Sequence, residues 1–131
     1  MNELHIKQSL TYFLVKFEEN ALDFSDFAKT LDLDLATLER FGTESTIEIG
    51  RNEFYEDDIN DMLRITLKDL LGKEERLVML KEKYRLEYFL ERVPVLYPER
   101  DDNQRLSLAD DILAFMHLTG THDDLDYFLF A

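Results

Sequence analysis

The segment FYEDDIND, residues 54–61, places four carboxylates within six positions, directly after two aromatic residues. The carboxylates are Glu56, Asp57, Asp58 and Asp61. If the segment is helical, Asp57, Asp58 and Asp61 lie close enough to converge on one cation. Magnesium is often held by one or two carboxylates together with phosphate oxygens of a substrate. The same carboxylates also suit a helix start, where the macrodipole favours each by about 0.3–1 kcal/mol, or a surface that docks a basic partner. We favour these last two interpretations.

The pattern Asp57-Asp58-Ile59-Asn60-Asp61 resembles the first acidic motif of isoprenoid diphosphate synthases. That resemblance implies a magnesium–diphosphate site completed by a second acidic motif on a facing helix. It covers five residues, and a chain of 131 residues is too short to enclose a prenyl chain as those large helical enzymes do. We therefore predict no metal site in this segment.

A second cluster occurs in THDDLD, residues 121–126, where His122, Asp123, Asp124 and Asp126 offer mixed nitrogen and oxygen ligands. Neighbouring positions on a helix diverge by about 100°, so these side chains cannot all face one ion. The pattern is typical of a capped helix with acidic residues in its first turn. We expect a terminal helix here.

A third arrangement is similar to helical nucleotide pyrophosphatases, in which acidic pairs on two facing helices bind magnesium. Glu87 and Glu91 lie four residues apart, and the pair Asp110-Asp111 could face them. The E-E-x-x-E pattern of those enzymes is not reproduced, and pairing between Lys83 and Glu87 on one helix face explains the spacing without a metal.

Nucleophilic catalysis and glycine-loop phosphate binding lack their usual residues. The chain has no cysteine, and its three histidines, His5, His117 and His122, do not lie in a recognisable Ser- or Thr-containing turn. The four glycines are too far apart for a phosphate-binding loop. We predict that the protein is not an enzyme and has no catalytic residues, no metal and no cofactor.

The composition and net charge limit the kinds of partner that we expect the protein to bind. The net charge of −14 creates a field that repels nucleic acid and anionic lipid and speeds encounter with basic proteins. The N-terminal residues lack the pattern of a secretory signal, and no stretch approaches the roughly 20 apolar residues of a membrane span. We expect a cytoplasmic protein that binds neither nucleic acid nor membrane.

Apolar residues recur at helical spacing along most of the chain, as Ile6, Leu10, Phe13 and Phe17 do. We predict an all-α fold: one domain over residues 1–131, a compact bundle of about six or seven helices, with at most one short extended segment near 45–50. The predicted helices span 3–19, 24–31, 34–42, 53–71, 73–93, 107–120 and the residues from 121 onward.

Local signals mark the expected helix ends. Asp23 and Asp34 are predicted N-caps, and Ser107 is expected to open a capping box. Gly72 and Gly120 are predicted to end helices. The helix over 53–71, with Asn52 as its cap, is expected to bury one stripe made of Ile59, Leu63, Thr66, Leu67 and Leu70.

Three acidic clusters lie beside aromatic residues, a combination typical of interfaces in which aromatic side chains anchor and carboxylates steer a basic partner. The predicted partner-binding residues are Tyr55, Glu56, Asp57, Asp58, Asp61, Tyr97, Asp101, Asp102, Asp123 and Asp124.

In size, charge and style, over the whole chain and without a shared motif, the protein is similar to the immunity proteins that bacteria make against polymorphic and contact-dependent growth-inhibition toxins. That resemblance implies a protein that occludes the substrate cleft of a basic, nuclease-like toxin. Two alternatives stay open: a metal-dependent phosphohydrolase that uses acidic helix faces, and a helical adaptor that binds a partner through an apolar groove. The oligomeric state is left open.

Overall fold

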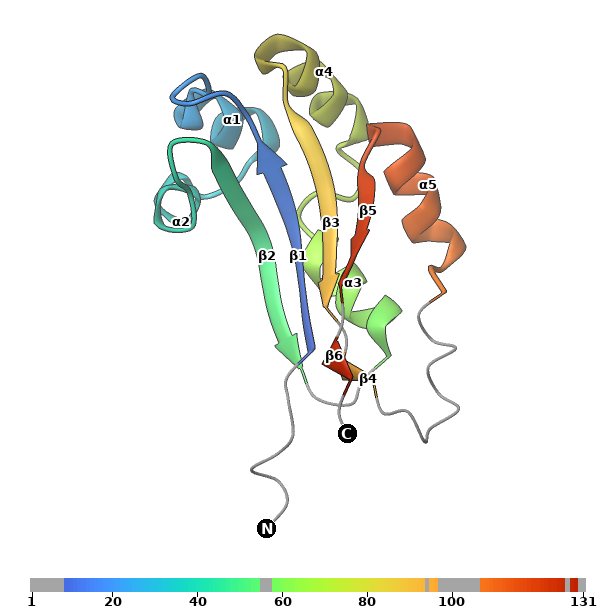
Figure 1. Ribbon diagram of the computed structural model, residues 1–131. Coiled ribbons are helices and arrows are strands. Elements are labelled where there is room, and N and C mark those ends of the chain that lie inside the picture. The colour runs from blue at the N-terminus through green and yellow to red at the C-terminus, as the bar shows by residue number, and fades with distance from the viewer. Residues whose placement is uncertain (1–8, 55–57, 94, 97–106, 127, 130–131) are drawn as a thin grey trace.

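The computed structural model describes residues 9–54, 58–93, 95–96, 107–126 and 128–129 (Figure 1). Within these ranges the chain forms a four-stranded mixed sheet, a pair of two-residue strands and five helices. In chain order the elements are β1 (Ser9–Lys16), α1 (Phe24–Leu31), α2 (Leu35–Arg40), β2 (Thr46–Phe54), α3 (Ile59–Leu67), α4 (Glu74–Tyr84), β3 (Glu87–Val93), β4 (Val95–Leu96), α5 (Asp110–Thr119), β5 (His122–Leu125) and β6 (Phe128–Leu129).

The sheet has the strand order β2-β1-β3-β5. Strand β1 runs antiparallel to both of its neighbours, whereas β5 runs parallel to β3. A parallel neighbour needs a crossover connection, and α5 lies in the crossover between β3 and β5. Figure 1 shows α3, α4 and α5 on one side of the sheet. The predicted all-α bundle is therefore wrong, and the protein is α/β.

The first predicted helix, residues 3–19, is contradicted by β1, which covers Ser9–Lys16. Buried and partly buried residues alternate along the strand, and its inward positions include Ser9 and Thr11. Because these two inward residues are polar, the sequence does not show the alternation of apolar and polar residues that is typical of a strand. Thr11 can be buried because its Oγ1 shares a hydrogen bond of 2.8 Å with Oγ1 of Thr66 on α3.

The predicted helix over 73–93 divides into α4 and β3. The helix ends at Arg85, whose backbone is left-handed with φ 56°, and the amide of Leu86 donates to the carbonyl of Lys81. A left-handed backbone at a helix end is usually adopted by glycine or asparagine. Because an arginine occupies this position, the sequence did not indicate that the helix ends there. Beyond it Tyr88, Leu90 and Arg92 are buried in alternation.

Two more helix predictions fail at their starts. Strand β2 continues to Phe54, so α3 begins only at Ile59, and Asp58 rather than Asn52 is its N-cap. Residues His122–Leu125 form β5, in the segment where a terminal helix was predicted. Ser107 opens no capping box, because Ala109 is the N-cap of α5 and no side chain caps that helix.

Other local predictions are confirmed. Asp23 and Asp34 cap α1 and α2 through hydrogen bonds from backbone amides, and Gly120, with φ 66°, ends α5. All five residues of the predicted stripe over Ile59–Leu70 are buried. The short extended segment near 45–50 is the beginning of β2, which is longer than predicted and pairs with β1.

The core lies between one face of the sheet, called the inner face here, and the helices. Phe13 of β1 packs against Phe115 of α5, with ring centroids 6.1 Å apart. The hydroxyl of Tyr88 on β3 donates to the carbonyl of Leu77 on α4 over 2.6 Å. Within the described ranges, no helix is long and apolar enough to cross a membrane.

Candidate binding face

The opposite side of the sheet, called the outer face here, is covered by none of the helices that the structure describes (Figure 1). Side chains alternate between the two faces along each strand, so strand register defines its members. They are Leu10, Tyr12, Leu14 and Lys16 of β1, Thr46, Glu48, Arg51 and Glu53 of β2, Glu87, Phe89, Glu91 and Val93 of β3, and His122 and Asp124 of β5.

Partly buried aromatic and aliphatic side chains occupy the middle of the outer face. Leu14 of β1 lies directly opposite Phe89 of β3. The Phe89 ring contacts the His122 ring, with centroids 5.2 Å apart, and Nζ of Lys16 lies 4.8 Å from the Phe89 centroid. Aromatic rings that remain accessible amid charged neighbours are characteristic of protein-binding surfaces.

Charged groups continue across the face on both sides of Tyr12. On β2, the Arg51 guanidinium lies 5.6 Å from the Tyr12 ring centroid and forms an ion pair of 3.0 Å with Glu48. On β3, Glu91 is the register partner of Tyr12. Burial, together with the negative charges of Glu91 and Glu48, raises the pKa of the Tyr12 hydroxyl, so this ring stays neutral on the face.

Glu91 and Asp124 lie side by side on β3 and β5, as register partners in the parallel pair. Burial, together with the hydrogen bond and the negative charge of Asp124, raises the pKa of Glu91 to about 8. Oε2 of Glu91 is buried and has no hydrogen-bond partner among the described residues. At neutral pH this pair of carboxyl groups therefore retains a proton.

The predicted site residues do not form one cluster. Asp58 accepts a hydrogen bond from the amide of Asn60 as the cap of α3, and Asp61 is ion-paired with Arg64 over 2.8 Å. Arg64 also contacts Asp111 of α5 over 2.8 Å. These carboxylates therefore contact the helices, on the side of the sheet opposite the outer face. Six predicted residues lie outside the described ranges: Tyr55, Glu56, Asp57, Tyr97, Asp101 and Asp102.

The predicted pair Asp123 and Asp124 is divided between the two faces because it lies on a strand. Asp123 points to the inner face and accepts two hydrogen bonds, of 2.9 and 2.8 Å, from the buried Arg92 guanidinium. Asp124 alone belongs to the outer face. Sequence reasoning missed Tyr12 and Phe89 and considered Glu91 only as half of an acidic pair on a helix. The segment EYFLERV gave no clear signal for β3, because Tyr88, Phe89 and Leu90 are consecutive and do not alternate with polar residues.

Metal binding finds no geometric support in the described part of the chain. There, no three His, Asp or Glu side chains are grouped so that they could hold one metal ion. Glu87 and Glu91 lie on a strand rather than a helix, and Asp111 is paired with Arg64. The acidic helix faces of the pyrophosphatase comparison are thus not formed by these residues. Lys83, expected to pair with Glu87, contacts Asp26 instead.

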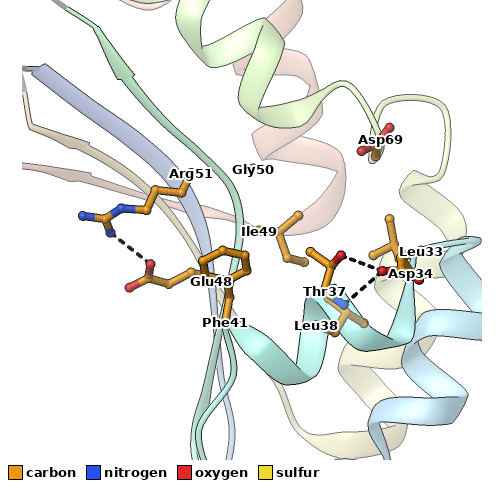
Figure 2. A pocket seen from close by; sticks show the side chains of 10 residues that line it. All are labelled: Leu33, Asp34, Thr37, Leu38, Phe41, Glu48, Ile49, Gly50, Arg51 and Asp69. Carbon is orange, nitrogen blue, oxygen red and sulfur yellow. Dashed lines mark hydrogen bonds and ion pairs between the residues drawn. The ribbon is translucent and has the colours of Figure 1, made fainter.

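A pocket of about 330 Å³ lies between α2 and β2 (Figure 2), and its lining includes Glu48 and Arg51 of the outer face. Its apolar lining is made of Leu33, Leu38, Phe41 and Ile49. Figure 2 shows the Glu48 and Arg51 side chains extending away from Ile49 and toward each other. The pocket therefore adjoins the outer face at the edge strand β2, because Glu48 and Arg51 belong to both.

No family model matches this chain, and no curated protein or solved structure matches it either. Its function is accordingly inferred from the geometry of its own residues.

Proposed function

We propose that this is an acidic binding protein that inhibits a basic, nuclease-like partner protein, in the manner of a toxin immunity protein, and that it docks through the outer face of its sheet. One observation carries the proposal: a sheet face that none of the described helices covers has accessible aromatic and aliphatic side chains at its centre and carboxylates around them, in a chain of net charge −14. We place the protein in the cytoplasm, in keeping with its cysteine-free composition.

The two kinds of residue have different roles in this proposal. Tyr12, Leu14 and Phe89 are the anchors, because burying aromatic and aliphatic area supplies most of the binding free energy at interface centres. Glu48, Glu53 and the other carboxylates steer a basic surface toward the face and set the orientation of docking. A nuclease cleft evolved to receive phosphates would accept this carboxylate-bearing face and be closed to its substrate.

Mutation of the anchors tests the proposal. A partner is captured from native lysate at low salt, purified, and titrated with the wild-type protein and with Phe89→Ala. Losing a central anchor should weaken binding by about tenfold or more, which corresponds to about 1.4 kcal/mol. The partner's nuclease activity should be suppressed by the wild-type protein and escape suppression by the variant at equal concentration.

Met79→Ala and Leu118→Ala are matched controls, because these large apolar side chains are 55% and 60% exposed on the helical layer. They should leave the affinity unchanged. If they weaken binding while Phe89→Ala does not, the helical layer is the interface and the outer face is not.

The pocket beside β2 favours a second candidate, the adaptor that binds a partner through an apolar groove. Its apolar walls would hold one large apolar side chain of a partner. Salt separates the two candidates: contacts made by charge weaken when salt screens them, whereas an apolar contact keeps its strength. The phosphohydrolase alternative gains no support from the described residues.

A further inference from the structure

Besides its parallel backbone pairing with β3, strand β5 has two carboxyl contacts of opposite character with that strand. It is an edge strand of four residues, all of them exposed, and its neighbour is β3. On the inner face, Asp123 is held by two hydrogen bonds from Arg92, and this contact needs an ionised carboxylate. On the outer face, Asp124 meets Glu91, and this contact needs a proton.

The need for a proton follows from the chemistry of the pair. Two carboxylates have only acceptor atoms, so a hydrogen bond between Glu91 and Asp124 forms only when one of them is protonated. When both are ionised, their charges repel each other across the strand pair, and the buried Oε2 of Glu91 loses solvation without gaining a partner.

The surrounding charged groups do not stabilise Glu91 and Asp124 in the state in which both are ionised. The groups of the outer face that surround Glu91 are Tyr12 and Lys16 of β1, Glu48 and Arg51 of β2, Glu87 of β3, His122 and Asp124 of β5, and Asp126 directly after it. Lys16 favours the ionised form of Glu91, but its ammonium lies over the Phe89 ring, and Arg51 is paired with Glu48. Asp126 adds a further negative charge that opposes ionisation.

We infer that a proton shared by Glu91 and Asp124 fastens β5 to the outer side of the sheet, and that the edge strand loosens when this proton is lost while Arg92 still holds its inner side. The device does not depend on the proposed binding function.

The direction of the pH effect follows from the shift. The pKa of Glu91 rises from the usual 4.5 to about 8 in the folded protein, so the folded chain holds this proton more tightly than the unfolded chain. The contribution to stability is therefore fully present below about pH 4.5 and is lost as the pH rises through about 8. The pair titrates as a unit, and the proton is shared between its two carboxyl groups.

Two NMR measurements on the whole chain test the inference. The carbon shift of the Glu91 carboxyl is followed from pH 4 to 10 and should change with a midpoint near 8. Amide exchange, corrected for the intrinsic effect of pH, is measured at pH 6.5 and pH 9. Protection of residues 122–125 should fall by about tenfold or more at pH 9 relative to the amides of β1, because local opening exposes an edge strand first.

Glu91→Gln provides the decisive variant, because its amide is neutral at every pH and can donate to Asp124. In it, protection of β5 should be the same at both pH values. Glu87→Gln removes a carboxylate from the same strand and face and should behave as the wild type. His122→Gln is the second control, because histidine side chains change charge between about pH 5 and 8 and could imitate the effect.

Three results would overturn the inference: a Glu91 midpoint below about pH 6, equal protection of β5 at both pH values in the wild type, or an unchanged pH response in Glu91→Gln. If Glu91→Gln does not fold, Asp124→Asn takes its place. That variant removes the neighbouring negative charge, so the Glu91 midpoint should move down, and a midpoint that stays in place would equally contradict a shared proton.

Discussion

At the scale of single residues, one threonine joins the helical layer to the sheet. Thr66 of α3 donates its hydroxyl hydrogen to the carbonyl of Gly50 over 2.8 Å, and its Oγ1 lies 2.8 Å from Oγ1 of Thr11. Both threonines are buried. Burying a hydroxyl is tolerated only when it is hydrogen-bonded, so each of these groups depends on the others.

Thr66→Val should lower the free energy of unfolding by about 1–3 kcal/mol, because the Thr11 hydroxyl and the Gly50 carbonyl lose their partner while the valine fills the same volume. Urea unfolding monitored by circular dichroism measures the loss. The double variant Thr11→Val with Thr66→Val should cost less than the sum of the two single variants, since their mutual hydrogen bond is lost only once. Strict additivity would show that the two hydroxyls do not interact.

Gly50 lies where the register of β1 and β2 shifts, and its φ of +69° is left-handed. A Cβ there would lie 2.1 Å from the Thr66 carbonyl oxygen. Gly50→Ala should therefore destabilise the protein by several times the roughly 1–2 kcal/mol that left-handed backbone costs a non-glycine residue. Gly72→Ala is the matched control, because Gly72 has φ +86° but nothing within 4 Å of the added atom. Equal losses in thermal or urea unfolding would argue against close packing of α3 on the bulge.

At the scale of elements, the short helix α2 forms one wall of the pocket and depends on its cap. Asp34 accepts hydrogen bonds from the Thr37 amide over 3.1 Å and from its hydroxyl over 2.6 Å. A helix of six residues has little stability of its own, so the cap contributes a large part of it. The wall of the pocket therefore rests on a contact that the sequence shows locally.

Asp34→Ala should cost about 0.5–2 kcal/mol of stability, the usual loss for an N-cap. Asp69→Ala is the control, since Asp69 also lines the pocket but caps none of the described helices. Amide exchange should show faster opening of residues 35–40 in Asp34→Ala alone. Equal behaviour of the two variants would mean that α2 is held by its packing rather than by its cap.

At the scale of the whole molecule, the proposed binding uses both the net charge of −14 and the outer face, which none of the described helices covers. In the proposed complex, long-range attraction brings a basic partner to the surface, and the apolar centre sets how slowly that partner dissociates. The association rate with the captured partner should fall by an order of magnitude or more between about 0.02 and 0.5 M salt, while the dissociation rate changes little. Surface plasmon resonance separates the two rates. An association rate that is indifferent to salt would favour the apolar pocket as the contact.

The sequence alone determined features whose causes lie within a few residues. Asp23 and Asp34 cap helices because an N-cap needs only the amides of the next turn, and Gly120 ends α5 because it can adopt a left-handed backbone. The buried stripe that includes Ile59 and Leu63 was predicted because its period lies within one helix. The acidic character also follows from composition, and the basic partner inferred from it stays a prediction.

Tertiary structure decided everything that depends on partners distant in the chain. Thr11 can lie inward on a strand because Thr66 of α3 supplies a hydroxyl partner for it. Since Thr11 and the buried Ser9 are both polar, the apolar period alone indicated a helix. Glu91 and Asp124 meet only because β5 returns parallel to β3 after α5. Strand pairing brings together residues whose separation in the sequence follows no fixed spacing, so the sequence does not show which residues pair. Whether a segment forms a strand or a helix depends on its contacts with the rest of the sheet.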